Sequence, residues 1–221
     1  MMYDILETKE RITADNEKVA EDTRTLLKEK GIFFVNLMAS PGAGKTTLLT
    51  QVIKKLKDEY RIGVMEADVD SDVDAKTISD LGVKVIQLHS AGLCHMDADM
   101  MYRGLEKFGI EDLDVIFLEN IGNLVCPAEF DVGASKRIMI LSVPEGDDKP
   151  LKYPLMFQVS DLCLINKIDA KEVFDFDEEK FIENAHKQNP NLTIIPVSAL
   201  TGEGIQTFID WLEKEIEEWR K

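Results

Sequence analysis

The chain has 221 residues, of which 44% are hydrophobic and 31% are charged, so we expect one domain, or two small ones, with a well-buried core. It carries 26 Lys and Arg against 42 Asp and Glu, which gives a formal net charge of −16. An acidic surface of this kind repels phosphodiester backbones and argues against a nucleic-acid-binding protein.

The sequence also shows no sign of a membrane or secretory segment. No stretch approaches the roughly 20 apolar residues of a membrane span. The opening residues, MMYDILETKE, have neither the basic nor the apolar region of a secretory signal. The three cysteines are too few, and odd in number, for a disulfide framework. We therefore expect a cytoplasmic protein with no membrane partner.

Strand-like and helix-like segments alternate along the chain, a pattern typical of an α/β fold with a mainly parallel sheet flanked by helices. The first predicted helix covers residues 14–30, and we expect residues 1–31 to pack on one larger domain, residues 32–221. Roughly seven buried strands are predicted, at 32–38, 61–65, 83–88, 114–118, 138–143, 161–165 and 192–197. Further helices are predicted at 45–57, 97–108, 177–188 and 204–219, and 145–154 is the most loop-like stretch.

A glycine-rich segment, ASPGAGKTT at residues 39–47, stands between the first predicted strand and a helix. It matches the phosphate-loop pattern G-x-x-x-x-G-K-[ST] at Gly44, Lys45 and Thr46, while Ala39 replaces the first glycine. A purely structural glycine turn is the alternative. The buried strand before the segment and the helix after it favour phosphate binding.

Each part of this loop has a chemical role in that interpretation. Gly42 and Gly44 let backbone N–H groups face phosphate oxygens without a Cβ in the way. Lys45 reaches the terminal phosphates, and the Thr46 hydroxyl is available to Mg2+. The predicted phosphate contacts are Gly42, Ala43, Gly44, Lys45, Thr46 and Thr47.

Two later loops indicate which base would be bound. Asn166-Lys167-Ile168-Asp169 follows a buried strand and resembles the N-K-x-D guanine motif, in which Asp169 accepts hydrogen bonds that adenine cannot supply. Asn166 would support the loop, and the Lys167 stem would lie along the base. The tetrapeptide alone could be an ordinary strand-exit loop. Ser198, Ala199 and Leu200 follow the last strand and resemble the loop that contacts the guanine carbonyl, so GTP is favoured over ATP.

Carboxylates at two predicted strand ends are candidates for holding Mg2+ with Thr46. Glu119 begins an E-x-x-G segment ending at Gly122, whose N–H could sense the γ-phosphate, and Asp68 is the second candidate. We interpret the other aspartates of this acidic run, Asp70, Asp72 and Asp74, as solvated. The predicted catalytic set is Lys45, Thr46, Asp68 and Glu119. Since no catalytic glutamine or arginine is evident, we expect slow hydrolysis.

Cys94, His95 and Cys126 form a candidate metal site for zinc or nickel, because both segments follow parallel strands whose loops could converge. Three ligands leave a tetrahedral shell incomplete, and a second copy of the chain could complete it. The alternative is that these cysteines are small buried side chains, as we expect for Cys163 inside a strand.

Six segments taken together resemble the hydrogenase nickel-incorporation GTPases, the HypB family, over residues 32–204. They are ASPGAGKTTLL, the E-A-D…D-A element at 66–75, CHMDA at 94–98, ENIGNLVCPAEFD at 119–131, EGDDKPLKYP, and NKID. The resemblance implies a P-loop G domain of the SIMIBI type that hydrolyses GTP slowly with Mg2+. It also implies a homodimer when GTP is bound.

The resemblance further implies delivery of nickel to [NiFe] hydrogenase, with a HypA-like nickel carrier and the hydrogenase large subunit as partners. It assigns the metal ligands to Cys94, His95 and Cys126. Residues 1–31 contain neither a cysteine motif nor a His-rich tract, so nickel storage is not expected. Lys149 is a candidate for reaching a nucleotide across the dimer, with an exposed loop lysine as the alternative. Two alternative functions are a metal scaffold that uses GTP only as a docking switch and a urease-type nickel-delivery GTPase.

Overall fold

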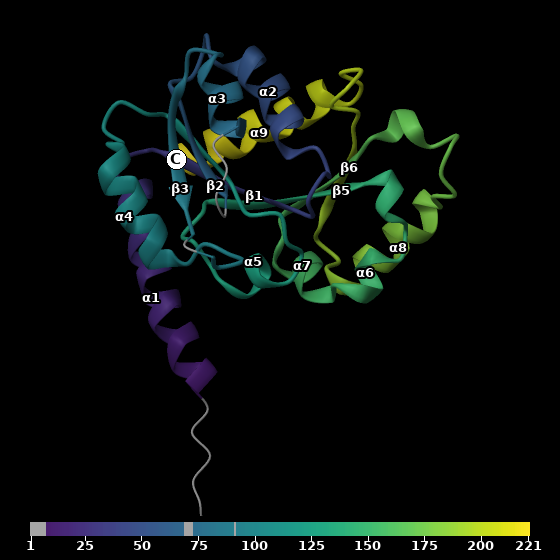
Figure 1. The fold of residues 1–221 in the computed structure, drawn as a ribbon, viewed down its shortest axis with the longest axis horizontal. Helices are drawn as coiled ribbons and strands as arrows, with labels where there is room; N and C mark the ends of the chain where they lie inside the picture. The colour runs from purple at the N-terminus through teal and green to yellow at the C-terminus, as the bar shows by residue number, and fades with distance from the viewer. Residues whose placement is uncertain (1–7, 69–72, 91) are drawn as a thin grey trace, which may run out of the picture.

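The structure is a computed structural model that describes residues 8–68, 73–90 and 92–221. A sheet of 7 strands lies between two layers of helices (Figure 1). The strands are β1 (Phe33–Ala39), β2 (Ile62–Asp68), β3 (Lys84–His89), β4 (Val115–Glu119), β5 (Lys136–Ser142), β6 (Leu162–Asn166) and β7 (Thr193–Pro196). Every neighbouring pair is parallel, in the order β3-β2-β4-β1-β5-β6-β7, which confirms the predicted fold class.

The strand order places the candidate site at the centre of the sheet. Strand β1 lies between β4 and β5, so the chain crosses to opposite sides of β1 along the sequence. In open parallel sheets, ligands bind beyond the carboxyl ends of the strands at such a reversal. The glycine-rich loop follows β1 at this point, and the Glu119 end of β4 lies next to it.

One face of the sheet is covered by α2 (Lys45–Leu56), α3 (Val73–Ser79) and α9 (Ile205–Arg220), which Figure 1 shows above the strands. Helix α2 buries an apolar stripe at helical spacing, namely Leu48, Leu49, Val52, Ile53 and Leu56. These side chains pack with apolar residues of β1, β4 and α9 in one continuous core. This packing fixes α2 against the sheet, and it therefore fixes the position of the glycine-rich loop that precedes α2.

The other face carries the remaining helices in two groups. Helix α1 (Thr8–Glu29) lies beside α4 (Ala98–Phe108) and extends beyond the rest of the molecule at its N-terminal end (Figure 1). The second group is α5 (Cys126–Glu129), α6 (Lys149–Lys152), α7 (Pro154–Val159) and α8 (Glu178–Gln188). The described residues include no helix that is both long enough and apolar enough to cross a membrane.

Several predicted boundaries were wrong. The first helix begins at Thr8, well before residue 14, and β2 continues past Met65 to Asp68. The expected loop at 145–154 instead contains α6 and the start of α7, with a 3-10 turn at Val143–Glu145. Prolines made this stretch look irregular, but each stands in the first turn of a helix, where its missing N–H is not needed.

Candidate functional site

The glycine-rich loop turns sharply between β1 and α2. Gly44 stands at the N-cap of α2 with a φ of 100°, a left-handed conformation that favours glycine. A Cβ at this position would lie 2.5 Å from Asn166 Nδ2, so the turn has no room for a side chain. Because Gly44 has no side chain to cap α2, the first N–H groups of this helix carry no side-chain cap and are available to an anion.

Asn166 joins the three predicted nucleotide loops. Its side chain is 1% exposed, and its Nδ2 donates a hydrogen bond of 2.8 Å to the Ala43 carbonyl. Its Oδ1 accepts a hydrogen bond of 3.0 Å from the Ala199 N–H. Lys167 adds a second link to the glycine-rich loop, with Nζ 2.6 Å from the Gly42 carbonyl. The supporting role predicted for Asn166 thus has a geometric basis.

Asp169 is held from the loop that follows β7. The Ser198 hydroxyl donates to the Asp169 carboxylate, and Ser198 Oγ accepts a hydrogen bond of 3.1 Å from the Thr201 N–H. Ser198 is fully buried, whereas Asp169 is exposed and Leu200 is 77% exposed. The carboxylate is therefore oriented by a rigid neighbour while remaining accessible to a base.

A cavity of about 650 Å³ opens between the glycine-rich loop and the ends of β2 and β4. It is lined by Pro41, Gly42, Gly44, Lys45, Thr46, Thr47, Asp68, Asp74, Glu119, Ile121, Gly122 and Lys167. Asp74 is exposed, as predicted, but it lies in α3 rather than in a loop and also lines the cavity. The same prediction for Asp70 and Asp72 falls outside the described residues.

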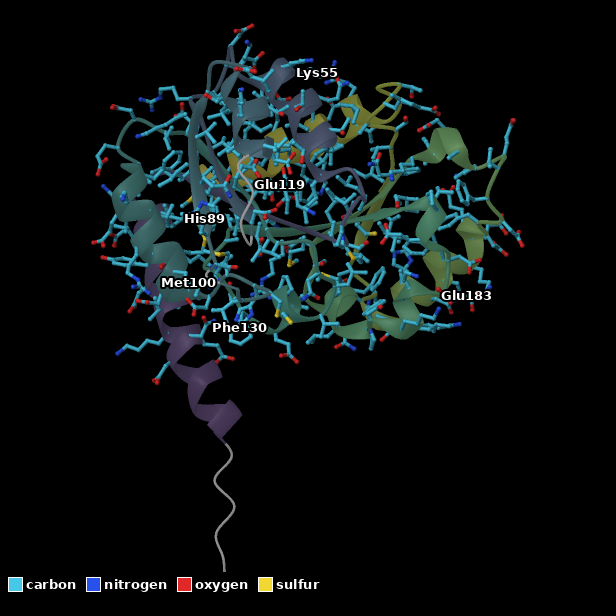
Figure 2. The ribbon with its side chains drawn as sticks, viewed as in Figure 1. Lys55, His89, Met100, Glu119, Phe130 and Glu183 are labelled. Carbon is cyan, nitrogen blue, oxygen red and sulfur yellow. The ribbon has the colours of Figure 1, made fainter. Side chains whose placement is uncertain are left out.

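Two buried carboxyl groups meet beside Lys45. Glu66 on β2 and Glu119 on β4 are aligned in register, and their exposed fractions are 3% and 4%. Thr46 Oγ1 donates a hydrogen bond of 2.7 Å to Glu119 Oε1. Glu66 Oε1 and Glu119 Oε2 are buried and receive no hydrogen bond from N–H or hydroxyl groups of the described residues. Figure 2 shows Glu119 near the middle of the molecule.

Burial dominates the protonation of this pair. Loss of hydration and, after it, the negative charge on Glu119 raise the pKa of Glu66 to about 9. Loss of hydration also raises the pKa of Glu119 to about 7, against the opposing effects of the Thr46 hydroxyl and Lys45. The contact between the two carboxyl groups raises the pKa of Glu66 and lowers that of Glu119. Burial and the neighbouring carboxylate therefore favour the protonated form of Glu66 over that of Glu119.

A Glu66→Gln variant is expected to be more stable than the wild type at pH 7. Between the usual glutamate pKa and the raised value, the folded chain holds one proton more than the unfolded chain. The free energy of unfolding therefore falls as pH rises, by about 1.4 kcal/mol per pH unit. Between the usual glutamate pKa and pH 7, the free energy of unfolding of the wild type falls by on the order of 3 kcal/mol. A neutral Gln does not titrate and avoids this loss.

The measurement is urea unfolding of both nucleotide-free proteins from pH 5 to pH 9, with the gap between them widening as pH rises. Asp114→Asn is the control whose difference in stability from the wild type should stay constant from pH 5 to pH 9, because Asp114 titrates below this range. The Arg61 hydrogen bond lowers the pKa of Asp114 to about 2, so Asp114 stabilises the fold above its ordinary pKa and loses that effect on acidification. Equal pH dependence of Glu66→Gln and wild type would show that Glu66 is ionised in the folded protein.

The predicted metal ligands come together beyond the ends of β3 and β4. The Sγ atoms of Cys94 and Cys126 lie 2.7 Å apart, and Cys94 Sγ lies 3.8 Å from His95 Nδ1. One ligand atom from each of the three residues lies within 4.8 Å of the others. Burial lowers the pKa of His95 and favours the neutral imidazole that metals bind. Cys163 is fully buried in β6, as predicted.

The segment 119–126 connects this cluster to the cavity. Gly122 packs against Pro41 of the glycine-rich loop, where an added Cβ would lie 3.0 Å from the Pro41 nitrogen. The Asn123 N–H donates 2.8 Å to the Ala39 carbonyl. Asn123 Oδ1 accepts from the Cys126 N–H at 3.4 Å, and its Nδ2 donates to the Cys94 carbonyl at 3.4 Å. Asn123, which the sequence analysis did not single out, thus touches both the loop and the cluster.

Lys149 is neither in a loop nor freely exposed. It is the first residue of α6, its side chain is 19% exposed, and its Nζ lies 3.8 Å from the Asp148 carboxylate. It does not occur among the described residues that line the 650 Å³ cavity. The segment before it nevertheless touches the glycine-rich loop, because the Ser40 hydroxyl donates to Glu145. Its predicted contact across a dimer stays a prediction.

Fold and site together define a P-loop nucleotide-binding domain with a Cys/His cluster beside the phosphate cavity. The family model described as "CobW/HypB/UreG, nucleotide-binding domain" matches residues 33–196. The chain belongs to this family, and within it to the HypB hydrogenase maturation factors.

Two named relatives illustrate the match. "Hydrogenase maturation factor HypB" of Rhizobium leguminosarum bv. viciae is 43% identical over 209 residues, 95% of this chain and 70% of the relative. "Probable hydrogenase maturation factor HypB" of Methanocaldococcus jannaschii is 36% identical over 214 residues, 97% of each chain.

Solved structures agree. HypB from Archaeoglobus fulgidus has a TM-score of 0.85 at 39% identity, covering 92% of this chain and 99% of its own. HypB from Helicobacter pylori in complex with nickel has a TM-score of 0.85 at 35% identity, covering 94% and 98%. The signal recognition particle receptor FtsY from Elizabethkingia anophelis, 13% identical with a TM-score of 0.55, shares the fold alone.

Proposed function

We propose that this chain is a GTP-binding, slowly GTP-hydrolysing metallochaperone of the cytoplasm that assists nickel insertion into [NiFe] hydrogenase. The observation that carries the proposal is the 119–126 segment, which touches the phosphate cavity at one end and contributes Cys126 to the Cys/His cluster at the other. A nucleotide that moves this segment would change the geometry of the metal ligands. Nickel is the cargo in this proposal.

The cavity side chains suit a nucleoside triphosphate with Mg2+. The fit rests on the Thr46 hydroxyl, which touches Glu119, and on the buried Glu119 Oε2, which receives no hydrogen bond from N–H or hydroxyl groups of the described residues. Thr46, Glu119 and Asp68 would hold the ion, which when bound neutralises phosphate charge. Lys45 stabilises the terminal phosphates, and Asp169 with the 198–200 loop reads guanine.

Slow turnover follows from the composition of the cavity wall. Neither glutamine nor arginine occurs among the described residues that line the 650 Å³ cavity. Gln87 lines a smaller adjoining cavity of about 50 Å³ that shares Lys45 and Glu119. No arginine occurs among the described residues that line either cavity, so the transition state of hydrolysis would lack the arginine of fast GTPases. Besides the predicted magnesium ligands Asp68 and Glu119, Asp74 is the described residue with a carboxylate that lines this cavity.

A second copy of the chain would complete the metal site. Three ligands leave one position of a tetrahedral zinc or nickel shell open. Leu93 and Val125, 43% and 50% exposed, stand directly before Cys94 and Cys126, so each cysteine has an exposed apolar neighbour in sequence. We propose a GTP-dependent homodimer at this face, with a HypA-like nickel carrier and the hydrogenase large subunit as partners.

The test is the size of the protein by light scattering with GDP and with a non-hydrolysable GTP analogue, each with and without Ni2+. We expect a dimer with the analogue and a monomer with GDP, and Lys45→Ala should stay monomeric throughout because it loses phosphate affinity. Ni2+ bound per chain, measured in the same samples, should differ between the two nucleotides. A monomer in every condition would contradict the proposal.

The alternative is a metal scaffold that uses GTP only as a docking switch. One observation favours it: the described residues that line the 650 Å³ cavity include neither glutamine nor arginine. It predicts the same dimer but no phosphate release above the Lys45→Ala background, even with Ni2+. Phosphate release by the wild type that Lys45→Ala abolishes would exclude it.

A further inference from the structure

One side chain of the N-terminal helix touches both segments that carry the metal ligands. Asn16 Oδ1 accepts a hydrogen bond of 2.8 Å from the Ala98 N–H, three residues after His95. Asn16 Nδ2 donates a hydrogen bond of 2.8 Å to the Asp131 carbonyl, five residues after Cys126. The two backbone groups are far apart in sequence, so this amide sets the spacing between the segments.

The Asp131 end of this bridge is held firmly. Arg24, two turns along α1 from Asn16, donates through Nη2 to the Asp131 carboxylate at 2.6 Å and through Nε to the Ala134 carbonyl at 3.1 Å. Arg137 Nη2 donates to the same carboxylate oxygen at 2.5 Å, and the Gly133 N–H donates to the other at 2.9 Å. Asn16 is therefore hydrogen-bonded to a turn that Arg24, Arg137 and the Gly133 N–H hold in place.

Phe130 carries this constraint to a metal ligand. It immediately precedes Asp131, and its ring stacks on His95 with centroids 3.9 Å apart and planes 14° apart. Figure 2 shows Phe130 on the side of the sheet where α1 and α4 meet. Asn16 and Phe130 also line one cavity of about 260 Å³. The plane of the His95 imidazole is thus set by a residue whose neighbour is hydrogen-bonded to α1.

We propose that Asn16 is a positioning residue for the Cys94, His95 and Cys126 site, and that α1 clamps the two ligand segments at the spacing a metal ion requires. This inference rests on the proposed function only in that these three residues bind metal. Residues that orient ligands from outside the coordination shell typically change metal affinity by 10- to 100-fold when removed. Because both hydrogen bonds are to backbone groups, loss of the Asn16 amide loosens both segments at once.

The experiment measures Co2+ affinity by competition with a chelator, together with the Co2+ absorption bands that report ligand geometry. Asn16→Ala is expected to weaken binding about tenfold and to alter the bands. Asn16→Asp keeps the acceptor for the Ala98 N–H but loses the donor to Asp131, so its affinity should be intermediate. Thermal unfolding of the metal-free proteins is recorded in parallel.

Lys28→Ala is the matched control. Lys28 lies near the other end of α1, where its Nζ donates to the Trp219 carbonyl and packs over the Trp219 ring at 4.9 Å. It should bind Co2+ like the wild type. Wild-type affinity and spectrum in Asn16→Ala, or an equal loss in Lys28→Ala, would overturn the inference. A wild type that binds no Co2+ would overturn the proposed metal site and this inference with it.

Discussion

An Asp169→Asn variant is expected to lose GTP affinity by about a thousandfold and to prefer xanthosine triphosphate. The aspartate carboxylate accepts from both the ring N1–H and the exocyclic amine of guanine, and each hydrogen bond to a charged group contributes about 1.5–3 kcal/mol. An asparagine amide cannot accept both hydrogen bonds, and it turns a donor toward the base. Xanthine carries a carbonyl where guanine carries the amine, so the pairing is restored with that base.

The structure sharpens this prediction because Asp169 is accessible while its support is buried. Ser198 holds one carboxylate oxygen, and Asn166 fixes the loop to Ala43 and Ala199 without touching solvent. The substitution should therefore change base preference without unfolding the loop.

Titration of both triphosphates and of ATP by calorimetry measures the effect. Asp175→Asn, an exposed aspartate six residues along the same connection, is the matched control and should bind GTP as the wild type does. Unchanged GTP affinity in Asp169→Asn would remove the guanine interpretation of this loop.

The fold was largely predictable because the central strands are buried on both faces. Strands β1, β4 and β6 are buried along their whole length, so each appears in the sequence as an apolar run of strand length. Helix α3 was missed for the opposite reason. Ile78 is its buried residue within an Asp-rich stretch, too little to produce an amphipathic pattern.

The site was predictable where its chemistry is local in sequence and not where it depends on topology. The glycine-rich loop and NKID are contiguous motifs. Glu66 acquires its environment from Glu119 across the β2–β4 pairing, and the predicted strand ended one residue before it. Asn16 meets partners 82 and 115 residues away, a contact that no spacing rule along the chain could indicate.

Cys126→Ala is expected to lower metal affinity by at least a hundredfold. Structural zinc sites with four protein ligands bind with roughly 10–16 kcal/mol, so each ligand accounts for about 3 kcal/mol. Removing Cys126 leaves Cys94 and His95 as ligands in each chain. In a symmetric dimer both copies carry the substitution, so the metal ligands of each copy lose Cys126.

The matched control for this variant is Cys163→Ala, which removes a thiol of the same kind from the core. Cys163 is fully buried in β6, and burial raises the pKa of its thiol far above the usual range, so it forms no thiolate for a metal. Cys163→Ala should lose stability through a small cavity yet keep its full metal content. Metal per chain after gel filtration, measured for both variants with Ni2+ and with Zn2+, separates ligand loss from destabilisation. If Cys126→Ala retained wild-type metal content, the ion would have to bind elsewhere. The 119–126 segment could then no longer link nucleotide to cargo.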